Sequence, residues 1–265
     1  MRNFLVIILV LMFGNLYSQN PFWEGEDKQL IKKIVELVDS PSELHDYFSE
    51  KNKSPRNSRL GFGYWSKSSR IGAGYIGISC DFYFFKDSLI SYVLKPELPE
   101  NKRKKKKYLE WYNNKFEVSD DLQMEPRYYN YDTFKKPLKQ FNGKLINDGR
   151  IAYYMSPDSG LYYGGRGGFS MNLLQNRKLF IDLESSLNKE AIIQIMYSKN
   201  PASRLTAIEY YFRNSELFIK EKEELDKWTE IVFMQVPFIR TLNGCFGGME
   251  NSKEITQRYS KMKIE

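Results

Sequence analysis

The chain has 265 residues, of which 42% are hydrophobic and 28% charged, a composition that excludes a disordered or fibrous protein and allows one large domain or two small ones. Its two cysteines and single histidine are too few for the four Cys or His ligands of a structural zinc site, and we predict no metal and no cofactor. The net charge of +7 has a local source, because the basic and acidic residues balance once Arg2 and the run 102–107 are set aside.

The first 18 residues have the pattern of a secretory signal peptide. A short basic start, Met1–Asn3, precedes the apolar run Phe4–Phe13, and we expect cleavage after Ser18. The run is shorter than the roughly 20 residues that cross a bilayer, and no other segment approaches that length. We therefore predict an exported protein, periplasmic or secreted after signal-peptide removal, with no transmembrane span in the mature chain.

Two helices are expected at the start of the mature chain. Apolar residues at helical spacing predict the first one: Leu30, Ile31, Ile34, Leu37 and Val38. Ser40, Pro41 and Glu43 then have the pattern of an N-cap, a first-turn proline and a capping box. The single histidine, His45, is expected to be an exposed residue of this second helix, because no motif surrounds it.

A β-hairpin is predicted in the middle of the chain. Apolar residues alternate through 75–85, which indicates a strand with one buried face and places Cys80 inside. Residues 86–88 form a turn, and residues 89–95 return as the partner strand. An oxidising compartment would permit a disulfide between Cys80 and Cys245, whereas two free buried thiols would pack as small apolar groups, and the sequence leaves both open.

A basic run follows this hairpin. It consists of Lys102, Arg103, Lys104, Lys105, Lys106 and Lys107. Helical spacing of apolar residues between 108 and 116 predicts a helix that begins within the run. Cations at the start of a helix oppose its dipole, so helix stability does not explain them. They would attract an anionic lipid or glycan, and the alternative is a plain solvated segment.

Turn-forming residues between 142 and 170 predict further hairpins. The turn Pro157–Gly160 is expected to join a strand at 151–156 to a return at 161–163. The glycine-rich stretch YYGGRGGFS, Tyr162–Ser170, then fits neither phosphate-loop template, and nucleic acid is not a predicted partner. We interpret it as a glycine-loosened exit from the hairpin, with Arg166 able to bind an anionic group.

Aromatic and acidic residues provide two further candidate sites. Tyr129 and Tyr131 lie in an irregular stretch and would either stack on a sugar or a protein partner or pack beneath the segment. Asp158, Asp182 and Glu184 are the candidate carboxylates for acid and base catalysis. Asp182 and Glu184 would point to one side if their segment is extended, whereas acidic residues at the start of a helix would serve as caps.

Helical periodicity dominates the chain from about residue 182. It predicts helices around 187–199, 201–213 and 215–235, then a glycine-rich segment, then a last helix capped by Asn251. The expected fold class is α+β, with N-terminal helices, antiparallel β-hairpins in the middle and a helical C-terminal third. The expected regions are 1–18, 19–180 and 181–265, the last two either separate or one continuous domain.

The function that these features favour is a non-catalytic binding or structural role in the cell envelope. The basic run and the loop aromatics would contact an envelope component or a protein partner, including an anionic lipid or glycan. One alternative is a hydrolase that acts on glycans or peptidoglycan through paired carboxylates. Another is an inhibitor or immunity-type partner of a second exported protein.

Overall fold

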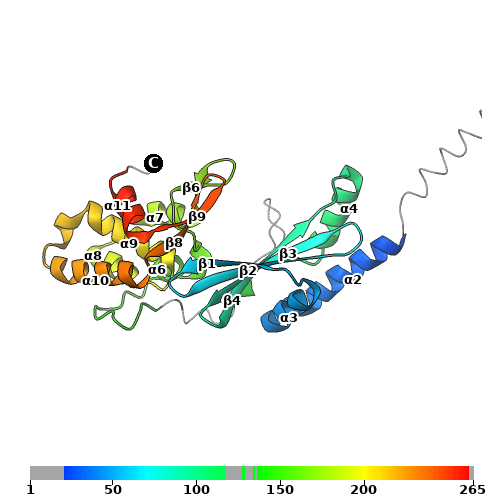
Figure 1. Ribbon diagram of the computed structural model, residues 1–265, viewed down its shortest axis with the longest axis horizontal. Helices are drawn as coiled ribbons and strands as arrows, with labels where there is room; N and C mark the ends of the chain where they lie inside the picture. The colour runs from blue at the N-terminus through cyan, green and yellow to red at the C-terminus, as the bar shows by residue number, and fades with distance from the viewer. Residues whose placement is uncertain (1–20, 117–126, 129–133, 135, 263–265) are drawn as a thin grey trace, which may run out of the picture. The chain divides into compact units, whose positions relative to one another are not determined.

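The structure has the α+β fold that the sequence predicts (Figure 1). The computed structural model describes residues 21–116, 127–128, 134 and 136–262, so the expected signal peptide, Tyr129 and Tyr131 lie outside them. The chain divides into two compact units. The first contains the described residues of Met1–Arg56, Lys67–Phe82 and Ser91–Arg127, and the second contains those of Asn57–Ser66, Tyr83–Ile90 and Tyr128–Glu265. The expected boundary after residue 180 lies within helix α7 (Gln175–Glu184).

The first unit has two helices at its start, as predicted, and a third in the basic run. They are α2 (Pro21–Leu37), α3 (Pro41–Lys51) and α4 (Lys102–Asn113). The start of α3 differs from the prediction, because the side chain of Ser40 makes no capping hydrogen bond. Pro41 occupies the first turn, where its fixed φ angle suits a helix and its missing N–H costs nothing.

The strands of the middle region form a five-stranded sheet in sequence order. They are β1 (Arg56–Gly61), β2 (Tyr64–Gly72), β3 (Gly77–Phe85), β4 (Ser88–Glu97) and β5 (Arg127–Tyr128). Alternate residues of β3 are buried, as the period of two predicts, and Cys80 is one of them. Within the first unit, the rings of Phe48 and Phe82 meet edge to face with centroids 5.5 Å apart, which packs α3 against β3.

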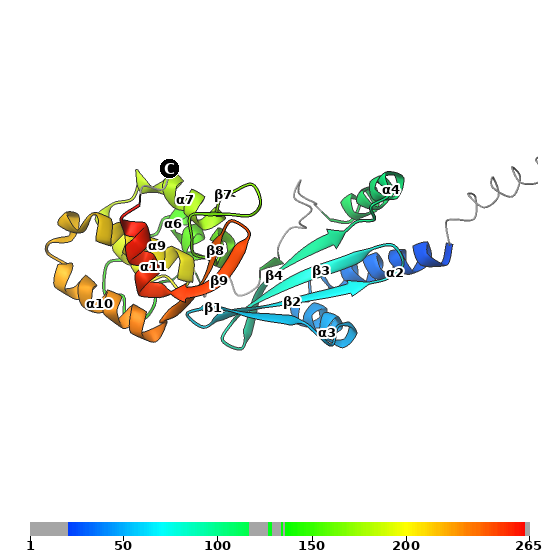
Figure 2. The same ribbon diagram turned by 45° about the horizontal axis from the view of Figure 1, so that its top comes forward.

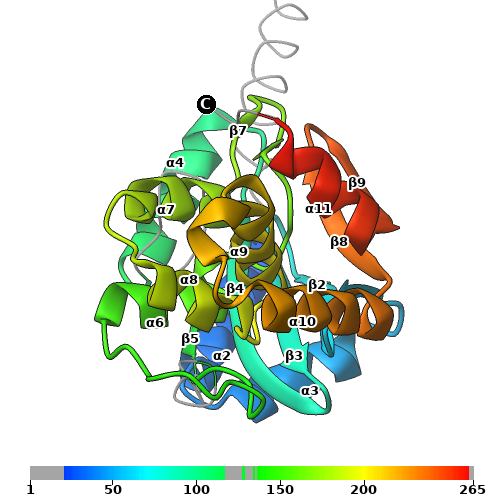
Figure 3. The same cartoon turned by 90° about the vertical axis from the view of Figure 1, so that its left-hand side faces the viewer.

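The second unit is built around one buried helix. Its helices are α6 (Gly149–Met155), the short 3₁₀ helix η1 (Pro157–Ser159), α7, α8 (Lys189–Met196), α9 (Pro201–Arg213), the 3₁₀ helix η2 (Ser215–Phe218), α10 (Lys222–Gln235) and α11 (Ser252–Ser260). Figure 3 shows α9 in the middle of this group. Every residue from Pro201 to Glu209 is buried, polar ones included, as expected of a helix covered on all sides.

Asn200 starts the central helix in the way that the Asn-Pro pair predicts. Its side-chain oxygen accepts hydrogen bonds from the backbone N–H groups of Ala202 and Ser203 at 2.9 and 3.3 Å. Its amide nitrogen donates to the carbonyl of Ser156 at 2.8 Å. One buried side chain therefore caps α9 and ties it to the segment before η1.

Two small hairpins complete the second unit. They are β6 (Arg166–Gly167) with β7 (Asn172–Leu173), and β8 (Phe238–Asn243) with β9 (Phe246–Asn251), both antiparallel. The second hairpin contains the glycine-rich segment that precedes the last helix. Asn251 caps α11 as predicted, accepting from the N–H groups of Lys253 and Glu254. In the parts of the chain that are described, no helix is long and apolar enough to cross a membrane.

The predicted strand at 151–156 is wrong, because these residues belong to α6. The carboxylate of Asp148 accepts from the N–H of Arg150 at 2.7 Å, so Asp148 is an N-cap and not part of a hairpin turn. Ile151, Tyr154 and Met155 form the buried face of the helix at spacings of three and four. The expected antiparallel return at 161–163 is also absent from this region, where Tyr163 makes a parallel bridge with Thr241 instead.

Candidate functional site

The turns of the two small hairpins lie side by side in the second unit (Figure 2). The N–H of Gly168 donates to the carbonyl of Gly244 at 2.9 Å, and the N–H of Gly244 donates to the carbonyl of Arg166 at 3.1 Å. These bonds join the β6–β7 turn to the β8–β9 turn. We call the apolar side chains of the two turns the twin tip: Phe169, Met171, Cys245 and Phe246.

The side chains of the twin tip are exposed to solvent. Phe169 is 95% exposed and Phe246 is 85% exposed, and Met171 and Cys245 are also exposed. A large aromatic side chain this open to water contributes nothing to the core, and two of them lie here on adjacent hairpin tips. The hydrogen bonds between the turns satisfy backbone groups that would otherwise need water, so the twin tip can enter an apolar environment at a lower cost.

Arg166 lies in the first of the two hairpins, where the sequence predicted a group able to bind an anion. It is exposed on β6, and its guanidinium donates to the carbonyl of Met171 at 3.3 Å. The chain has no Asp or Glu between residues 159 and 181 or between 231 and 249, the two stretches that contain the hairpin turns. The charge that these two stretches carry is therefore positive.

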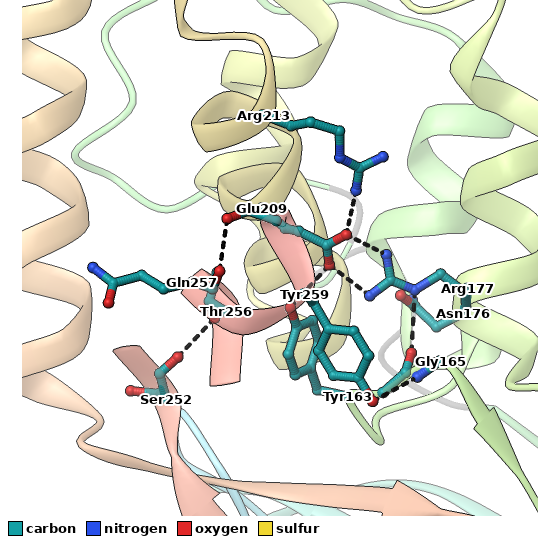
Figure 4. A network of polar contacts seen from close by, with 12 residues as sticks. Tyr163, Gly165, Asn176, Arg177, Glu209, Arg213, Ser252, Thr256, Gln257 and Tyr259 are labelled. Atoms are coloured by element: carbon teal, nitrogen blue, oxygen red, sulfur yellow. Dashed lines mark hydrogen bonds and ion pairs between the residues drawn. The ribbon is translucent and has the colours of Figure 1, made fainter. Parts of the chain in front are cut away.

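A buried ion pair fixes the chain just before β6 (Figure 4). Glu209 of α9 is 0% exposed and Arg177 of α7 is 3% exposed, and two hydrogen bonds of 2.9 and 2.6 Å join them. Glu209 also accepts from the hydroxyl of Tyr163 at 2.9 Å and from the guanidinium of Arg213. The Nε of Arg177 donates to the carbonyl of Gly164 at 3.1 Å, so the ion pair positions the backbone that leads into the hairpin.

The electrostatics of this network keep Arg177 and Tyr163 in their usual charge states. Burial lowers the pKa of Arg177, but the Glu209 carboxylate more than offsets that effect and leaves the pKa above its ordinary value. Burial raises the pKa of Tyr163, and Glu209 raises it further, so the phenol stays protonated and donates. Arg177 is therefore charged and Tyr163 neutral at any physiological pH.

The stretch YYGGRGGFS is thus held in place and is not a loosened hairpin exit. The N–H of Gly165 donates to the hydroxyl of Tyr259 on α11 at 3.2 Å. Gly164 has a φ angle of +156°, and a Cβ there would lie 2.5 Å from the carbonyl oxygen of Leu242. The glycine allows the two backbones to approach closely, which is a different role from the flexibility that the sequence indicated.

The basic run is the first half of α4 in the first unit. Asn101 caps the helix, which therefore begins within the run as predicted. Lys104 lies over the ring of Tyr75 with 3.4 Å from Nζ to the ring centroid, and Lys107 forms an ion pair with Glu24 at 2.8 Å. These two lysines hold α4 in place. The other four cations are exposed and have no ion pair with any described residue, and we call them the basic face: Lys102, Arg103, Lys105 and Lys106.

His45 is half-buried, which corrects the expectation of an exposed helix residue. Its ring meets the ring of Phe82 edge to face at 5.2 Å, and Lys67 Nζ lies 3.1 Å from its Nε2. Burial and the charge of Lys67 lower the pKa of His45, and Asp46 opposes them. The histidine is therefore a neutral packing residue of α3 at neutral pH.

The cysteines and the candidate carboxylates lie in separate places. Both cysteines are free thiols; burial raises the pKa of Cys80, and Cys245 is exposed in the twin tip. Asp158 lies in η1. Asp182 and Glu184 are two residues apart on helix α7, so they point to different sides and do not share the side expected of an extended segment. The described residues include no group of three His, Cys, Asp or Glu side chains that could bind a metal.

Phe169 and Phe246 are not among the binding residues that the sequence predicts. Each stands next to glycine at a hairpin tip, in GGFS and in GCFGG, and neither belongs to an apolar periodicity that would place it in the core. An isolated aromatic residue within a glycine-rich turn was the available signal. It did not show that the two turns meet, because they are far apart in the chain.

Comparison with protein-family models, with curated proteins and with solved structures found no match to this chain.

Proposed function

We propose that this protein is exported and acts without catalysis, by binding the anionic lipid surface of the cell envelope. The observation that carries the proposal is the twin tip, which presents Phe169 and Phe246 to solvent on two joined turns in an acid-free part of the chain. The basic face of α4 supports the proposal independently, because its four cations have no described partner. Each unit thus contributes one surface suited to an anionic membrane.

The energies expected from the twin tip fit weak, reversible membrane binding. Full burial of a Phe side chain is worth about 1.5–3 kcal/mol relative to leaving it exposed. A cation near an anionic surface adds about 1 kcal/mol. The two phenylalanines and Arg166 together would supply about 4–7 kcal/mol, which corresponds to dissociation constants from about 1 mM to about 10 µM. The basic face would strengthen this binding at low salt.

Vesicle sedimentation tests the proposal. The protein that lacks residues 1–18 should sediment with vesicles of phosphatidylglycerol and phosphatidylethanolamine, and less with phosphatidylcholine alone. The double variant Phe169→Ser/Phe246→Ser should bind these vesicles at least tenfold more weakly. Ile219→Ser is the matched control, because Ile219 is an exposed apolar residue of the same unit outside the twin tip, and it should bind like the wild type.

The basic face is tested by its salt dependence. Changing Lys102, Arg103, Lys105 and Lys106 to Gln should weaken vesicle binding at low salt and have little effect at high salt. Vesicle binding that is insensitive to the double Phe change would contradict the proposal. If an acidic polysaccharide displaces the wild type and the double Phe variant from vesicles equally well, the anionic ligand is a glycan and not a lipid.

One observation and one experiment bear on the alternatives. Asp182 and Glu184 would have shared one side in an extended segment, whereas α7 turns them to different sides, which does not favour the hydrolase alternative. The inhibitor or immunity-type alternative would be favoured by two results together. The wild type would capture one stoichiometric protein from an envelope extract and the double Phe variant would not, and neither the wild type nor this variant would bind vesicles. Export is tested separately, by sequencing the amino terminus of the protein from the envelope or periplasm, where Gln19 should be the first residue.

A further inference from the structure

A pocket in the second unit combines two arginines with apolar side chains. It has a volume of about 730 Å³ and lies between the β1–β2 turn and the segment that joins α10 to β8. Asn57, Arg59, Gln235, Phe238, Arg240 and Met249 are among its lining residues. Pockets that bind small molecules in proteins have volumes of roughly 300–1,000 Å³, so the size suits such a ligand.

The two arginines of this pocket lack partners within the described chain. Neither the guanidinium of Arg59 nor that of Arg240 has a hydrogen bond or an ion pair to another described residue. The Nε of Arg240 is shielded from solvent and has no hydrogen-bond partner. A buried N–H without an acceptor costs free energy, because it loses its bond to water and gains none in return. Two guanidinium groups that have no acceptor among the described residues therefore belong to the lining of one pocket.

The residues around the arginines leave their charge uncompensated. No Asp or Glu lines the pocket. The nearby Glu250 of β9 accepts from the hydroxyl of Thr241 at 2.8 Å and forms an ion pair with Arg258 at 2.6 Å, so its carboxylate is engaged elsewhere. A structural role would pair Arg240 with such a carboxylate, and the structure does not do so.

The apolar part of the pocket defines the rest of the ligand. Phe238 is 54% exposed and Met249 is 44% exposed, and they line the same pocket as the two guanidinium groups. Carboxylates and phosphates are the groups that an arginine fork binds with two hydrogen bonds. We propose that this pocket binds a small oxyanion, a carboxylate or a phosphate, that is carried on an apolar stem. This inference does not rest on the proposed membrane binding.

Calorimetric titration of the protein lacking residues 1–18 tests the pocket, with octanoate and octyl phosphate as probes. Octanol lacks the charge and inorganic phosphate lacks the stem, and both should bind at least tenfold more weakly. Preference for one charged probe would identify the oxyanion. The variants Arg59→Met and Arg240→Lys should each bind the preferred probe about tenfold to a hundredfold more weakly, because a charge-assisted or bidentate contact is lost.

A control variant and a folding check accompany this titration. Lys220→Gln removes one exposed positive charge from the same unit outside the pocket and should leave probe binding unchanged. Circular dichroism spectra should show all three variants folded, and Arg240→Lys keeps the charge, so a loss there reports the geometry of the guanidinium. Equal binding by wild type and both arginine variants, or no binding of either charged probe at millimolar concentration, would overturn the proposal while leaving the vesicle result untouched.

Discussion

Replacing Arg177 by Met should strongly destabilise the second unit. The change removes two of the hydrogen bonds that Glu209 accepts and the one that the carbonyl of Gly164 accepts. Glu209 is then left fully buried, and among the described residues the hydroxyl of Tyr163 and the guanidinium of Arg213 still donate to it. Breaking a buried ion pair by removing one partner costs about 3–5 kcal/mol. This cost is a large part of the about 5–15 kcal/mol by which most proteins are stable.

Urea unfolding followed by circular dichroism measures this cost. With a slope of about 2 kcal/mol per molar urea, a loss of about 4 kcal/mol lowers the midpoint by about 2 M. Arg213→Met is the matched control, because Arg213 contacts the same carboxylate but is 33% exposed, and its loss should cost about 1 kcal/mol or less.

A double-mutant cycle with Glu209→Leu completes the test. The double variant Arg177→Met/Glu209→Leu should cost less than the sum of the two single changes, because it leaves no uncompensated charge in the core. A midpoint shift for Arg177→Met no larger than that for Arg213→Met, or two single costs that add, would show that the buried ion pair does not have this energetic role.

Two further predictions concern the pH dependence of stability and one close contact. His45 has a lowered pKa in the folded protein, so the unfolded chain takes up the proton first as pH falls through about 6.5, and the free energy of unfolding should decrease below pH 7. Because His45 is the single histidine of the chain, His45→Gln should reduce the change of the urea midpoint with pH between about pH 5.5 and 7. A pH dependence equal to that of the wild type would contradict this assignment. Gly61 has a φ angle of +103°, and a Cβ there would lie 2.6 Å from Cδ1 of Ile239, so Gly61→Ala should cost about 1–3 kcal/mol in thermal unfolding. Gly248→Ala meets no atom within 4 Å and should be nearly neutral; equal melting temperatures for the two variants would refute the steric reading.

The elements that could be predicted from the sequence are those whose pattern is local and long. The apolar spacing of residues 30–38 predicted α2, and the strict alternation in 75–85 predicted β3 and the burial of Cys80. Asn200 and Asn251 were recognisable as helix starts because an N-cap acts within three residues of itself. In each case the residues that determine the structure are neighbours in the chain.

The segment 149–156 shows where local patterns become ambiguous. Asp148 followed by glycine indicates a hairpin turn, but the same pair is compatible with a helix cap. Short apolar stretches such as IAYYMS fit a strand or a buried helix equally well. In the helix, the buried hydroxyl of Tyr154 donates to Asn176 of α7 at 3.0 Å within the core of the second unit. That partner is not visible in the local sequence.

The twin tip could not be predicted for the same reason, and its construction explains how it could bind. Gly164 permits the close approach of β8, and Arg177 and Glu209 fix the chain that enters β6. The glycines of Tyr162–Ser170, which suggested a flexible segment, therefore belong to a segment that hydrogen bonds and close packing hold in place. A turn that is already ordered loses less conformational entropy when it binds than a flexible one does. Phe169 and Phe246 thus lie on hairpins that are held by hydrogen bonds, and under the proposed membrane binding they would lose little conformational entropy on insertion.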